Sequence, residues 1–346
     1  MKNEIRVMIC DDSAFMRMVI KDIIDSQSGI KVIGQARDGM EAVEKAVKLK
    51  PDVITMDVEM PRLNGLEAMK LITKKVATRV IMVSSLTQEG ADITVEALEN
   101  GAVDFVGKPS GSISTNFRKM GGELVSTINS AMQVKPSKIS LLRRQAVKKK
   151  PARRTFHTSN KIVLIASSTG GPKSLDNIIP SLPKNLPAPV VVIQHMPAGF
   201  TSSLARRLDR VSEIKVVEAK EGDILQKGTV YIAPGNYHLG MKPSGREVTL
   251  YLDKGAKING VRPAADFTFD KAAEIYRDKI IAVVLTGMGR DGTKGSFKIK
   301  HYKGRIMAEA KSSCVVYGMP KSVVQEGYAD YELPNDKISD KITALL

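Results

Sequence analysis

Six-residue apolar stretches alternate with segments of helical periodicity along the first 134 residues. The stretches are rich in Val, Ile and Met, and polar or glycine-containing positions follow each one. They read IRVMIC, KVIGQA, DVITMD, RVIMVS and AVDFVG, at residues 5–10, 31–36, 52–57, 79–84 and 102–107. Buried strands that alternate with helices form a parallel sheet covered on both faces. The pattern therefore predicts a doubly wound α/β domain of five β-α units.

The same alternation resumes after residue 160. Strand-like stretches read KIVLIA, PVVVIQ, TVYIAP, IIAVVLT and GRIMAEA, beginning at residues 161, 189, 229, 280 and 304. Helical periodicity covers residues 171–181, 199–210, 263–276 and 292–300, and residues 237–252 have the alternation of a β-hairpin. We therefore expect a second, Rossmann-like α/β domain that carries a small antiparallel hairpin.

Charge separates these two domains. The chain has a net charge of +16, yet residues 1–134 hold 17 basic and 18 acidic residues. Residues 135–161 hold ten basic residues and no acidic one, with prolines and no clear periodicity. Such a segment is typical of a solvated linker, although it could also contact anionic partners. We predict a first domain at residues 1–134, a basic flexible linker at 135–160 and a second domain at 161–346.

The chain has the composition of a cytoplasmic globular protein. No apolar run has the length of a membrane span, and the first residues lack the apolar core of a signal peptide. The two cysteines, Cys10 and Cys314, have neither the spacing of a metal site nor the number of a disulfide framework. We expect both to be reduced and packed.

Carboxylates follow two strands of the first predicted sheet. Asp11 and Asp12 come directly after the first strand, and Asp57 ends the third. The ends of strands one and three are neighbours at the switch point of such a sheet. Crowded carboxylates repel unless they share a cation, and oxygen ligands suit Mg²⁺. The sequence predicts a magnesium site here.

Two further polar residues end neighbouring strands. Ser84 ends the fourth strand, and Lys108 follows the fifth. A metal, a nucleophilic carboxylate, a hydroxyl and an ammonium group are the parts needed to transfer a phosphoryl group to an aspartate. Each residue alone has an ordinary explanation as a helix cap, a core residue or a surface charge. Their joint placement at strand ends favours phosphoryl transfer.

This constellation resembles the receiver domain of two-component response regulators over residues 4–133. The resemblance implies a phosphoacceptor aspartate, two metal-site acids, a switch hydroxyl, a switch aromatic and a lysine that holds the phosphoryl group. Asp57 matches the phosphoacceptor, and Asp11 and Asp12 match the metal-site acids. Ser84 matches the switch hydroxyl, Phe105 the switch aromatic and Lys108 the lysine. It also implies Mg²⁺ as the cofactor of phosphorylation and a histidine kinase as the phosphodonor.

The second domain places a hydroxyl, an imidazole and a carboxylate at strand ends. The stretch SSTGG at residues 167–171 follows the first strand, and its serines could cap the next helix or act as nucleophiles. His195, one of four histidines, closes the second strand, and Asp291 lies in a glycine-rich turn after a later strand. Ser168, His195 and Asp291 then complete a nucleophile, a base and an orienting acid.

Two other functions compete with hydrolysis. The stretch GMGRDG, with Gly287, Gly289 and Gly292, matches a dinucleotide-binding fingerprint, and Glu309 ends the next strand. This predicts a receiver-controlled oxidoreductase, although the motif falls late in the domain and leaves SSTGG without a role. The basic linker alternatively suits a non-enzymatic regulator that binds DNA, although no helix-turn-helix pattern is recognisable.

Several blocks together resemble the CheB family of chemotaxis response regulator protein-glutamate methylesterases over the whole chain. They are SSTGGP, QHMPAGFT, YIAPGNYHL, NGVRPAADF, LTGMGRDG and CVVYGMPKSVV. One departure is that Ala166 stands where glycine is more usual and Ser167 where alanine is common. Neither removes a catalytic group.

The resemblance implies hydrolysis of glutamate methyl esters on the cytoplasmic part of chemoreceptors, with methanol released, and deamidation of receptor glutamines. Ser168 matches the nucleophile, His195 the base and Asp291 the orienting acid, and the backbones around Thr169 and Met288 match an oxyanion site. The resemblance implies no cofactor for the hydrolysis and no specific nucleic acid as a partner. It implies contact with the membrane only indirectly, through the receptors.

Overall fold

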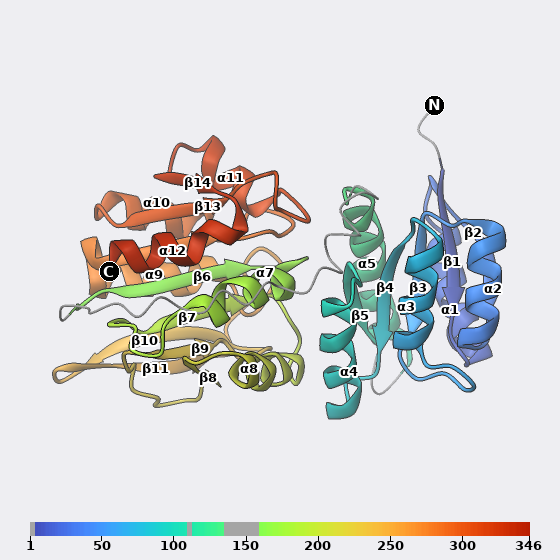
Figure 1. Cartoon of the computed structure of the whole chain (residues 1–346), viewed down its shortest axis with the longest axis horizontal. Helices are drawn as coiled ribbons and strands as arrows, with labels where there is room; N and C mark the ends of the chain where they lie inside the picture. Colours follow the sequence, from blue (N-terminus) through green and yellow to red (C-terminus); the bar gives the residue numbers. More distant parts are fainter. Residues whose placement is uncertain (1–3, 109–112, 135–158) are drawn as a thin grey trace. The chain divides into compact units, whose positions relative to one another are not determined.

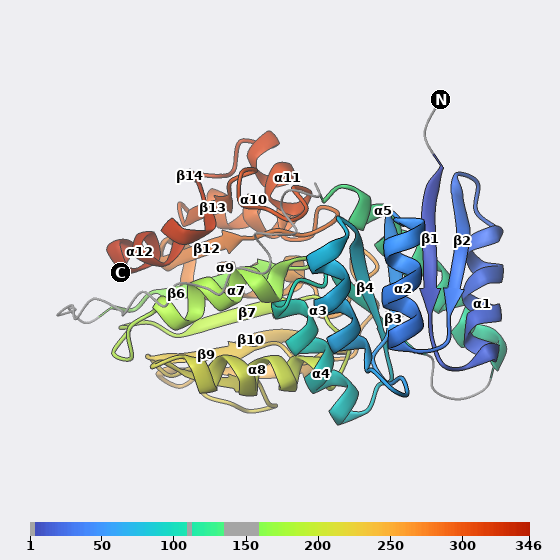
Figure 2. The ribbon, with the colours of Figure 1, turned by 45° about the vertical axis from the view of Figure 1, so that its right-hand side comes forward.

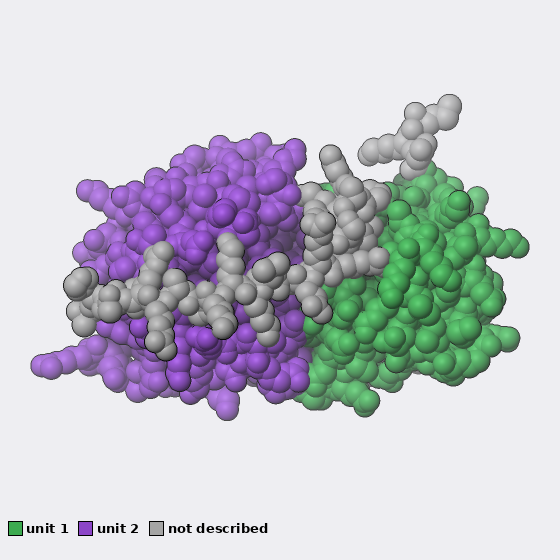
Figure 3. All heavy atoms as spheres, in the orientation of Figure 1, with its two compact units in different colours: residues 1–145 green, residues 146–346 purple. Residues whose placement is uncertain are grey.

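The computed structural model describes residues 4–108, 113–134 and 159–346, with the backbone course alone for 113–119. The chain divides into two compact units, residues 1–145 and 146–346 (Figure 3). The division falls within the predicted linker, which for residues 135–158 lies outside the described residues. Ser159 is buried and accepts a hydrogen bond from the Lys161 amide, so residue 159 is packed with the strand that follows.

The first unit is a five-stranded parallel sheet in the order β2-β1-β3-β4-β5 (Figure 1). Its strands are β1 Ile5–Cys10, β2 Ile30–Ala36, β3 Val53–Asp57, β4 Arg79–Ser84 and β5 Asp104–Gly107. Its helices are α1 Ala14–Asp25, α2 Gly39–Leu49, α3 Gly65–Lys75, α4 Gln88–Glu99 and α5 Ile113–Met132. Helix α1 packs against α5, and α3 packs between α2 and α4, so two helical layers enclose the sheet (Figure 2).

The second unit has a seven-stranded parallel sheet in the order β14-β13-β12-β6-β7-β9-β8, and β10 and β11 form an antiparallel hairpin. The parallel strands are β6 Ile162–Ser167, β7 Val190–Gln194, β8 Lys215–Glu218, β9 Thr229–Ile232, β12 Ile280–Val284, β13 Arg305–Glu309 and β14 Tyr331–Leu333, and the hairpin is β10 His238–Ser244 with β11 Glu247–Asp253. The helices are α7 Gly171–Ile178, α8 Phe200–Val211, α9 Ala265–Tyr276, α10 Thr293–His301, α11 Met319–Gln325 and α12 Asn335–Leu345, with 3₁₀ turns at Ile179–Ser181 and Arg277–Lys279.

The predicted fold class is confirmed in both units, and strand ends agree with the sequence pattern to within one or two residues for most strands. Two strands and two helices were not predicted. The strands β8 and β14 are short edge strands of four and three residues, too brief for a clear alternation. Helices α11 and α12 follow stretches whose turns and prolines obscured the helical period. They extend the sheet and cover it without changing its central order.

Strand β6 is the centre of the second unit. All six of its residues are buried, and it pairs with β7 on one side and β12 on the other. A strand covered on both faces needs apolar side chains at successive positions, which explains the run of Ile, Val and Leu. The carboxyl ends of β7, β6 and β12 therefore meet at one edge. Among the described residues, no helix combines the length and apolar character needed to cross a membrane.

The close packing of α9 and α10 can be tested at a glycine where helix propensity favours alanine but the neighbouring side chain leaves no room for it. Gly295 lies in α10, where an added Cβ would come 2.3 Å from the Phe269 Cβ of α9. Alanine favours a helix by about 1 kcal/mol over glycine, but overpacking a core costs about 1–3 kcal/mol. We therefore expect Gly295→Ala to lower the free energy of unfolding of the second unit by about 1 kcal/mol.

The control is Gly122→Ala in α5, where nothing lies within 4 Å of an added Cβ. This change should stabilise the first unit by about 0.5–1 kcal/mol. Calorimetric unfolding of the full chain measures both changes. Stabilisation by Gly295→Ala would show that α9 and α10 are not packed as closely as described.

Candidate functional site

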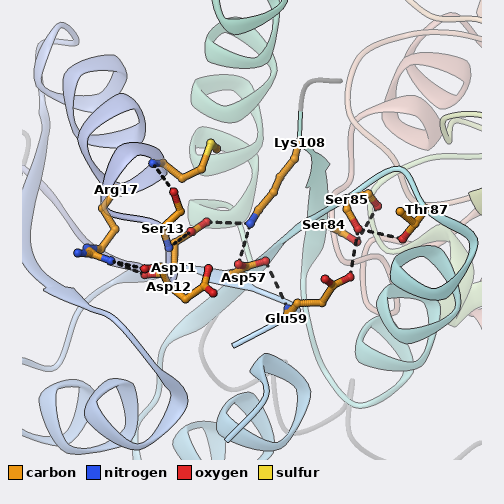
Figure 4. Close-up of polar contacts among 11 residues, drawn as sticks. Asp11, Asp12, Ser13, Arg17, Asp57, Glu59, Ser84, Ser85, Thr87 and Lys108 are labelled. Carbon is orange, nitrogen blue, oxygen red and sulfur yellow. Dashed lines mark hydrogen bonds and ion pairs between the residues drawn. The ribbon is translucent and has the colours of Figure 1, made fainter. Parts of the chain in front are cut away.

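Three carboxylates meet at the carboxyl edge of the first sheet (Figure 4). Strands β1 and β3 are paired, with Cys10 opposite Met56, so the residues that follow them are neighbours. One oxygen each of Asp11, Asp12 and Asp57 lies within 4.8 Å of the others. Asp11 and Asp57 are buried, whereas Asp12 is exposed. The predicted convergence of these carboxylates is present.

Lys108 joins the two buried carboxylates. Its Nζ lies 2.7 Å from Asp57 Oδ2 and 3.1 Å from Asp11 Oδ2 (Figure 4). Burial, with the charge of Asp11, raises the pKa of Asp57 to about 6 even though Lys108 acts in the opposite direction. Burial also raises the pKa of Asp11. Burial of Lys108 works to lower its pKa, but hydrogen bonds and charge from the two acids outweigh this effect and raise it. One ammonium group therefore compensates these carboxylates incompletely.

The donor set fits a magnesium ion. Asp11 Oδ2 is buried and accepts no hydrogen bond of good geometry within the part of the chain that the structure describes, and Lys108 Nζ forms an ion pair with it at 3.1 Å. Three carboxylates and no nitrogen or sulfur donors suit a hard cation such as Mg²⁺. The loop that carries two of them is held by Arg17, whose Nη1 donates to the carbonyls of Asp11 at 2.8 Å and Asp12 at 3.1 Å.

The other two predicted switch residues are placed differently. Ser84 is buried, and its hydroxyl donates to the carbonyls of Gly90 and Ser85 at 3.1 Å, so it contacts the start of α4 rather than Asp57. Phe105 is buried in the domain. The structure thus brings Lys108 to Asp57 and leaves the Ser84 hydroxyl engaged elsewhere.

Glu59 and Ser85 form a contact that sequence reasoning missed. Ser85 Oγ donates to Glu59 Oε1 at 3.2 Å and lies 3.0 Å from Thr87 Oγ1, and Thr87 caps α4 (Figure 4). The contact links the loop after β3 to the first turn of α4. Their positions within two residues of the ends of β3 and β4 are the signal that could have revealed it.

The two adjacent serines of the second unit have different environments. Ser167 is the last residue of β6, is fully buried and donates to Gln194 Oε1 at 2.6 Å. Ser168 lies one residue beyond the strand and is partly exposed. Gly171 comes so close that an added Cβ would lie 2.1 Å from Gln194 Oε1, which explains the second glycine of the stretch. Ser167 therefore supports the turn, and Ser168 presents its hydroxyl at the sheet edge.

Backbone contacts fix Ser168 between its two neighbouring strands. Its amide donates to the carbonyl of Thr286 at 3.0 Å, beyond the end of β12. Its carbonyl accepts from the Gly171 amide at 2.7 Å and from Gln194 Nε2, at the end of β7, at 3.1 Å. The sheet order therefore centres Ser168 between the strands that lead to His195 and Asp291.

His195 and Asp291 form a pair across this edge. The distance from His195 Nε2 to Asp291 Oδ2 is 2.7 Å, and both side chains are largely buried. No hydrogen bond joins Ser168 Oγ to the His195 ring in the described chain, a separation that is common before a substrate binds. A hydroxyl, an imidazole and a carboxylate on adjacent strand ends can carry out acyl transfer.

Asp291 is held in its charged form by the start of α9. The amides of Ala265 and Asp266 donate to its carboxylate at 2.6 and 3.1 Å, and Asn259 Nδ2 donates at 2.9 Å. Burial acts to raise the pKa of Asp291, but the hydrogen bond and charge of His195, together with these amides, outweigh it and lower the pKa. The carboxylate is therefore ready to orient the imidazole.

Asn259 and Asp266 were not predicted as site residues. Asn259 Nδ2 also donates to Asp266 Oδ2 at 2.8 Å, so one amide lies between two carboxylates. Asn259 has a φ of 53°, a left-handed conformation that asparagine tolerates better than most residues. Both residues lie in the block NGVRPAADF, which is the signal that could have indicated them. In the same block, Arg262 donates to the carbonyls of Lys254 and Gly255 at 2.6 Å.

The two segments predicted for an oxyanion site flank Ser168. An added Cβ at Gly287 would lie 2.8 Å from the Ser168 Cβ, so the turn that carries Met288 packs directly on Ser168. Met288 is 42% exposed, whereas Thr169 is buried and its carbonyl accepts from Thr286 Oγ1 at 3.0 Å. Both segments are near the hydroxyl, and their role as donors stays a prediction.

The dinucleotide interpretation of GMGRDG is wrong. The glycines do lie between β12 and α10, but Asp266 Oδ1 accepts from the Gly295 amide at 2.9 Å in the first turn of α10. Asp291, two residues before α10, is also a buried acid. A pyrophosphate would meet these two carboxylates where the fingerprint requires free amides. Glu309 is buried and accepts from the Thr286 amide at 2.9 Å, so it supports the turn.

The raised pKa of Asp57 predicts a pH-dependent instability of the first unit. Its folded pKa of about 6 lies above the ordinary value of 3.8, so the folded state binds more protons between these values and loses stability as the pH rises through them. The full effect is about 3 kcal/mol. Without metal, Asp57→Asn should therefore raise the free energy of unfolding by about 2–3 kcal/mol at pH 7.5, and by little at pH 4.

The control is Glu44→Gln, which removes an exposed carboxylate of α2. Urea unfolding across this pH range measures the difference, and added Mg²⁺ should reduce it by stabilising the wild type. Equal stability of wild type and Asp57→Asn at pH 7.5 would contradict the description of an incompletely compensated cluster.

Comparisons with known proteins agree with the division into two units. The family model described as CheB methylesterase matches residues 163–342, and the response regulator receiver domain matches residues 7–114. A protein-glutamate methylesterase/protein-glutamine glutaminase of Thermotoga maritima is 63% identical, with 99% of this chain and 98% of that protein covered. A protein of the same name from Pyrococcus abyssi is 47% identical, with 98% and 93% covered.

A solved structure also resembles the second unit. The crystal structure of the Thermotoga maritima CheB methylesterase catalytic domain has a TM-score of 0.54 and 64% identity, and the match covers 54% of this chain and 100% of that domain. The methylesterase model alone spans more than half of the chain. The chain therefore belongs to the CheB family of protein-glutamate methylesterases/protein-glutamine glutaminases, with a response regulator receiver domain before the methylesterase domain.

Proposed function

We propose that Ser168, His195 and Asp291 hydrolyse glutamate methyl esters on the cytoplasmic helices of chemotaxis receptors, and so contribute to sensory adaptation in the cytoplasm. The observation that carries this proposal is the 2.7 Å contact between His195 and Asp291 at the strand ends that flank Ser168. The names of the relatives supply the ester and the amide as substrates. In this proposal Ser168, His195 and Asp291 act as the nucleophile, the base and the orienting acid.

The reaction has two steps on this constellation. In the first, Ser168 Oγ bonds to the ester carbonyl carbon, His195 takes the hydroxyl proton, and the bond to methoxide breaks as His195 returns the proton to give methanol. In the second, water attacks the acyl-enzyme with the same help, and the glutamate carboxylate leaves. Because Nε2 of His195 faces Asp291, Nδ1 is the ring nitrogen that would exchange the proton. A glutamine substrate would follow the same steps with ammonia as the leaving group.

The negative oxygen of the tetrahedral intermediate needs hydrogen-bond donors. We assign this role to the backbone around Thr169 and Met288, since these two turns flank the Ser168 side chain. One such donor contributes about 3–4 kcal/mol of transition-state stabilisation in comparable sites. Hydrolysis itself requires no metal in this scheme.

We assign control of the hydrolase to phosphorylation of Asp57. Mg²⁺ held by Asp11, Asp12 and Asp57 would offset charge on the incoming phosphoryl group, and Lys108 would hold one of its oxygens. A chemotaxis histidine kinase would be the phosphodonor. The Ser84 hydroxyl, which donates a hydrogen bond to the Gly90 carbonyl, would turn toward the phosphoryl group. Helix α4 and Phe105 would shift with it. This change would release a restraint that the receiver places on the methylesterase domain.

Two adjacent serines provide a matched test of the nucleophile. Ser168→Ala should lower methanol release from methylated receptor fragments by about 1000-fold or more, because the attacking oxygen is lost. Ser167→Ala should cost about 1 kcal/mol of stability through its lost buried hydrogen bond and leave turnover within a few-fold of wild type. Near-normal turnover of Ser168→Ala would refute the assignment.

Removal of Asn259 tests the support of Asp291. Asn259→Ala should lower kcat about 10-fold, since a hydrogen bond to a charged group contributes about 1.5–3 kcal/mol, and should leave KM unchanged. Asn177→Ala is the control, because it removes an amide hydrogen bond of the same 2.9 Å length between α7 and α12. Steady-state kinetics separate the two parameters. A change in KM alone would assign Asn259 to substrate binding.

Phosphorylation gives a third kinetic prediction. A small phosphodonor with Mg²⁺ should raise methanol release by the full chain, and Asp57→Ala should abolish this response without removing basal activity. The isolated domain, residues 159–346, should be active without a donor. If it is no faster than the unphosphorylated full chain, the receiver does not restrain it.

A further inference from the structure

A groove lies beside the turn that carries the catalytic acid. It has a volume of about 460 Å³ and runs between the start of α10 and the end of α11. Its lining residues are Arg290, Thr293, Lys294, Phe297, Glu326 and Tyr328. Arg290 directly precedes Asp291, so the groove begins at the catalytic turn. The hydrolytic mechanism uses none of the six lining side chains.

The wall of the groove is aromatic and unusually exposed. Phe297 is 58% exposed and is the most exposed large apolar side chain among the described residues. Its ring lies 5.8 Å from that of Tyr328, measured between centroids, and the two planes are inclined by 55°. A paired aromatic surface of this kind is typical of a site that anchors a side chain of a partner.

The rim of the groove is basic. Lys294 is exposed, lies three positions before Phe297 on the same face of α10, and has no ion pair within the described ranges. Arg290 and Glu326 form a pair at 3.2 Å with both side chains about half exposed, so water screens it and a carboxylate of a partner could replace Glu326. The groove therefore combines an apolar wall with positive charge.

We propose that this groove binds the acidic receptor helix that carries the target glutamate. The proposal rests on the proposed function, because a receptor helix is the substrate only if the methylesterase assignment holds. A methyl ester offers few atoms for binding, so a protein substrate must be recognised by further contacts. A helix whose substrate side chains become glutamates is acidic, which complements Lys294 and Arg290. An apolar residue on that helix would fill the space beside Phe297 and Tyr328, as amphipathic helices do in grooves.

This docking surface should affect binding of the protein substrate and not the chemistry. Lys294→Glu reverses the charge at the rim, and Phe297→Ser removes the exposed aromatic wall. Both side chains are exposed, so neither change opens a cavity in the core. Matched controls are Lys227→Glu and Ile224→Ser, two exposed positions between β8 and β9 at the opposite edge of the sheet.

The experiment compares two substrates with each full-length variant, phosphorylated by a small donor with Mg²⁺. One substrate is a methylated receptor cytoplasmic fragment. The other is a small ester that lacks the rest of the receptor, the γ-methyl ester of N-acetylglutamate α-amide. We expect KM for the fragment to rise at least 10-fold in Lys294→Glu and Phe297→Ser, with kcat/KM for the small ester within twofold of wild type. Added salt should weaken fragment binding by the wild type more than by Lys294→Glu. The controls should resemble the wild type.

Three results would overturn the proposal. If KM for the fragment is unchanged in both variants, the groove does not bind the receptor helix, while Ser168-dependent methanol release still supports the proposed function. If both substrates lose activity together, the substitutions act on the catalytic turn. If the variants raise activity before phosphorylation with KM unchanged, the groove binds the receiver instead. Release of methanol that survives Ser168→Ala would refute the proposed function itself and is a separate outcome.

Discussion

The buried carboxylate of Asp291 is the group on which the geometry of the second unit depends. A buried charge is costly unless hydrogen bonds compensate it, and here two amides of α9, the Asn259 amide and the His195 ring provide that compensation. These donors come from the residue after β7, from the loop before α9 and from α9 itself. The turn after β12 must therefore approach both α9 and β7, which places the imidazole beside the end of β6 and Ser168.

The first unit uses the same sheet edge with the opposite electrostatic balance. Asp11 and Asp57 are as buried as Asp291, but one lysine is the main positive group that faces them, and the pKa of Asp57 rises to about 6. The pKa of Asp291 is lowered instead. A cluster of carboxylates whose negative charge is incompletely compensated favours the binding of a cation. A carboxylate whose charge is compensated by hydrogen bonds is instead held in one orientation. Local hydrogen bonds thus give the carboxylates of two similar sheet edges opposite shifts in pKa.

Much of this arrangement follows from the sequence because parallel strands end at one edge. Apolar runs located the strands, and the polar residue after each run located the carboxylates of the first unit and the triad candidates of the second. The choice between Ser167 and Ser168 could not be made from residue type. Ser168 was preferred for its place directly before TGG, and the structure adds that Ser167 donates a hydrogen bond to Gln194, which is 27 positions away.

Other features escaped because they depend on long-range contacts. Asn259 and Asp266 meet Asp291 across 32 and 25 positions, and no local pattern indicates such a pairing. The GMGRDG turn fits a dinucleotide fingerprint locally, and only the acids around α10 exclude it. The engagement of Ser84 by α4 likewise depends on a helix that the strand pattern does not place. Short edge strands such as β14 have too few residues to show a period.

We propose that Ser168, and not its neighbour, forms the acyl-enzyme. The most direct measurement is acid quench of the full chain during turnover of a glutamate methyl ester peptide, followed by mass spectrometry of the fragment that contains residues 162–173. We expect a glutamyl adduct on Ser168, with the oxygen of labelled water found in the product carboxylate and not in methanol. An adduct on Ser167, or labelled oxygen in methanol, would contradict it.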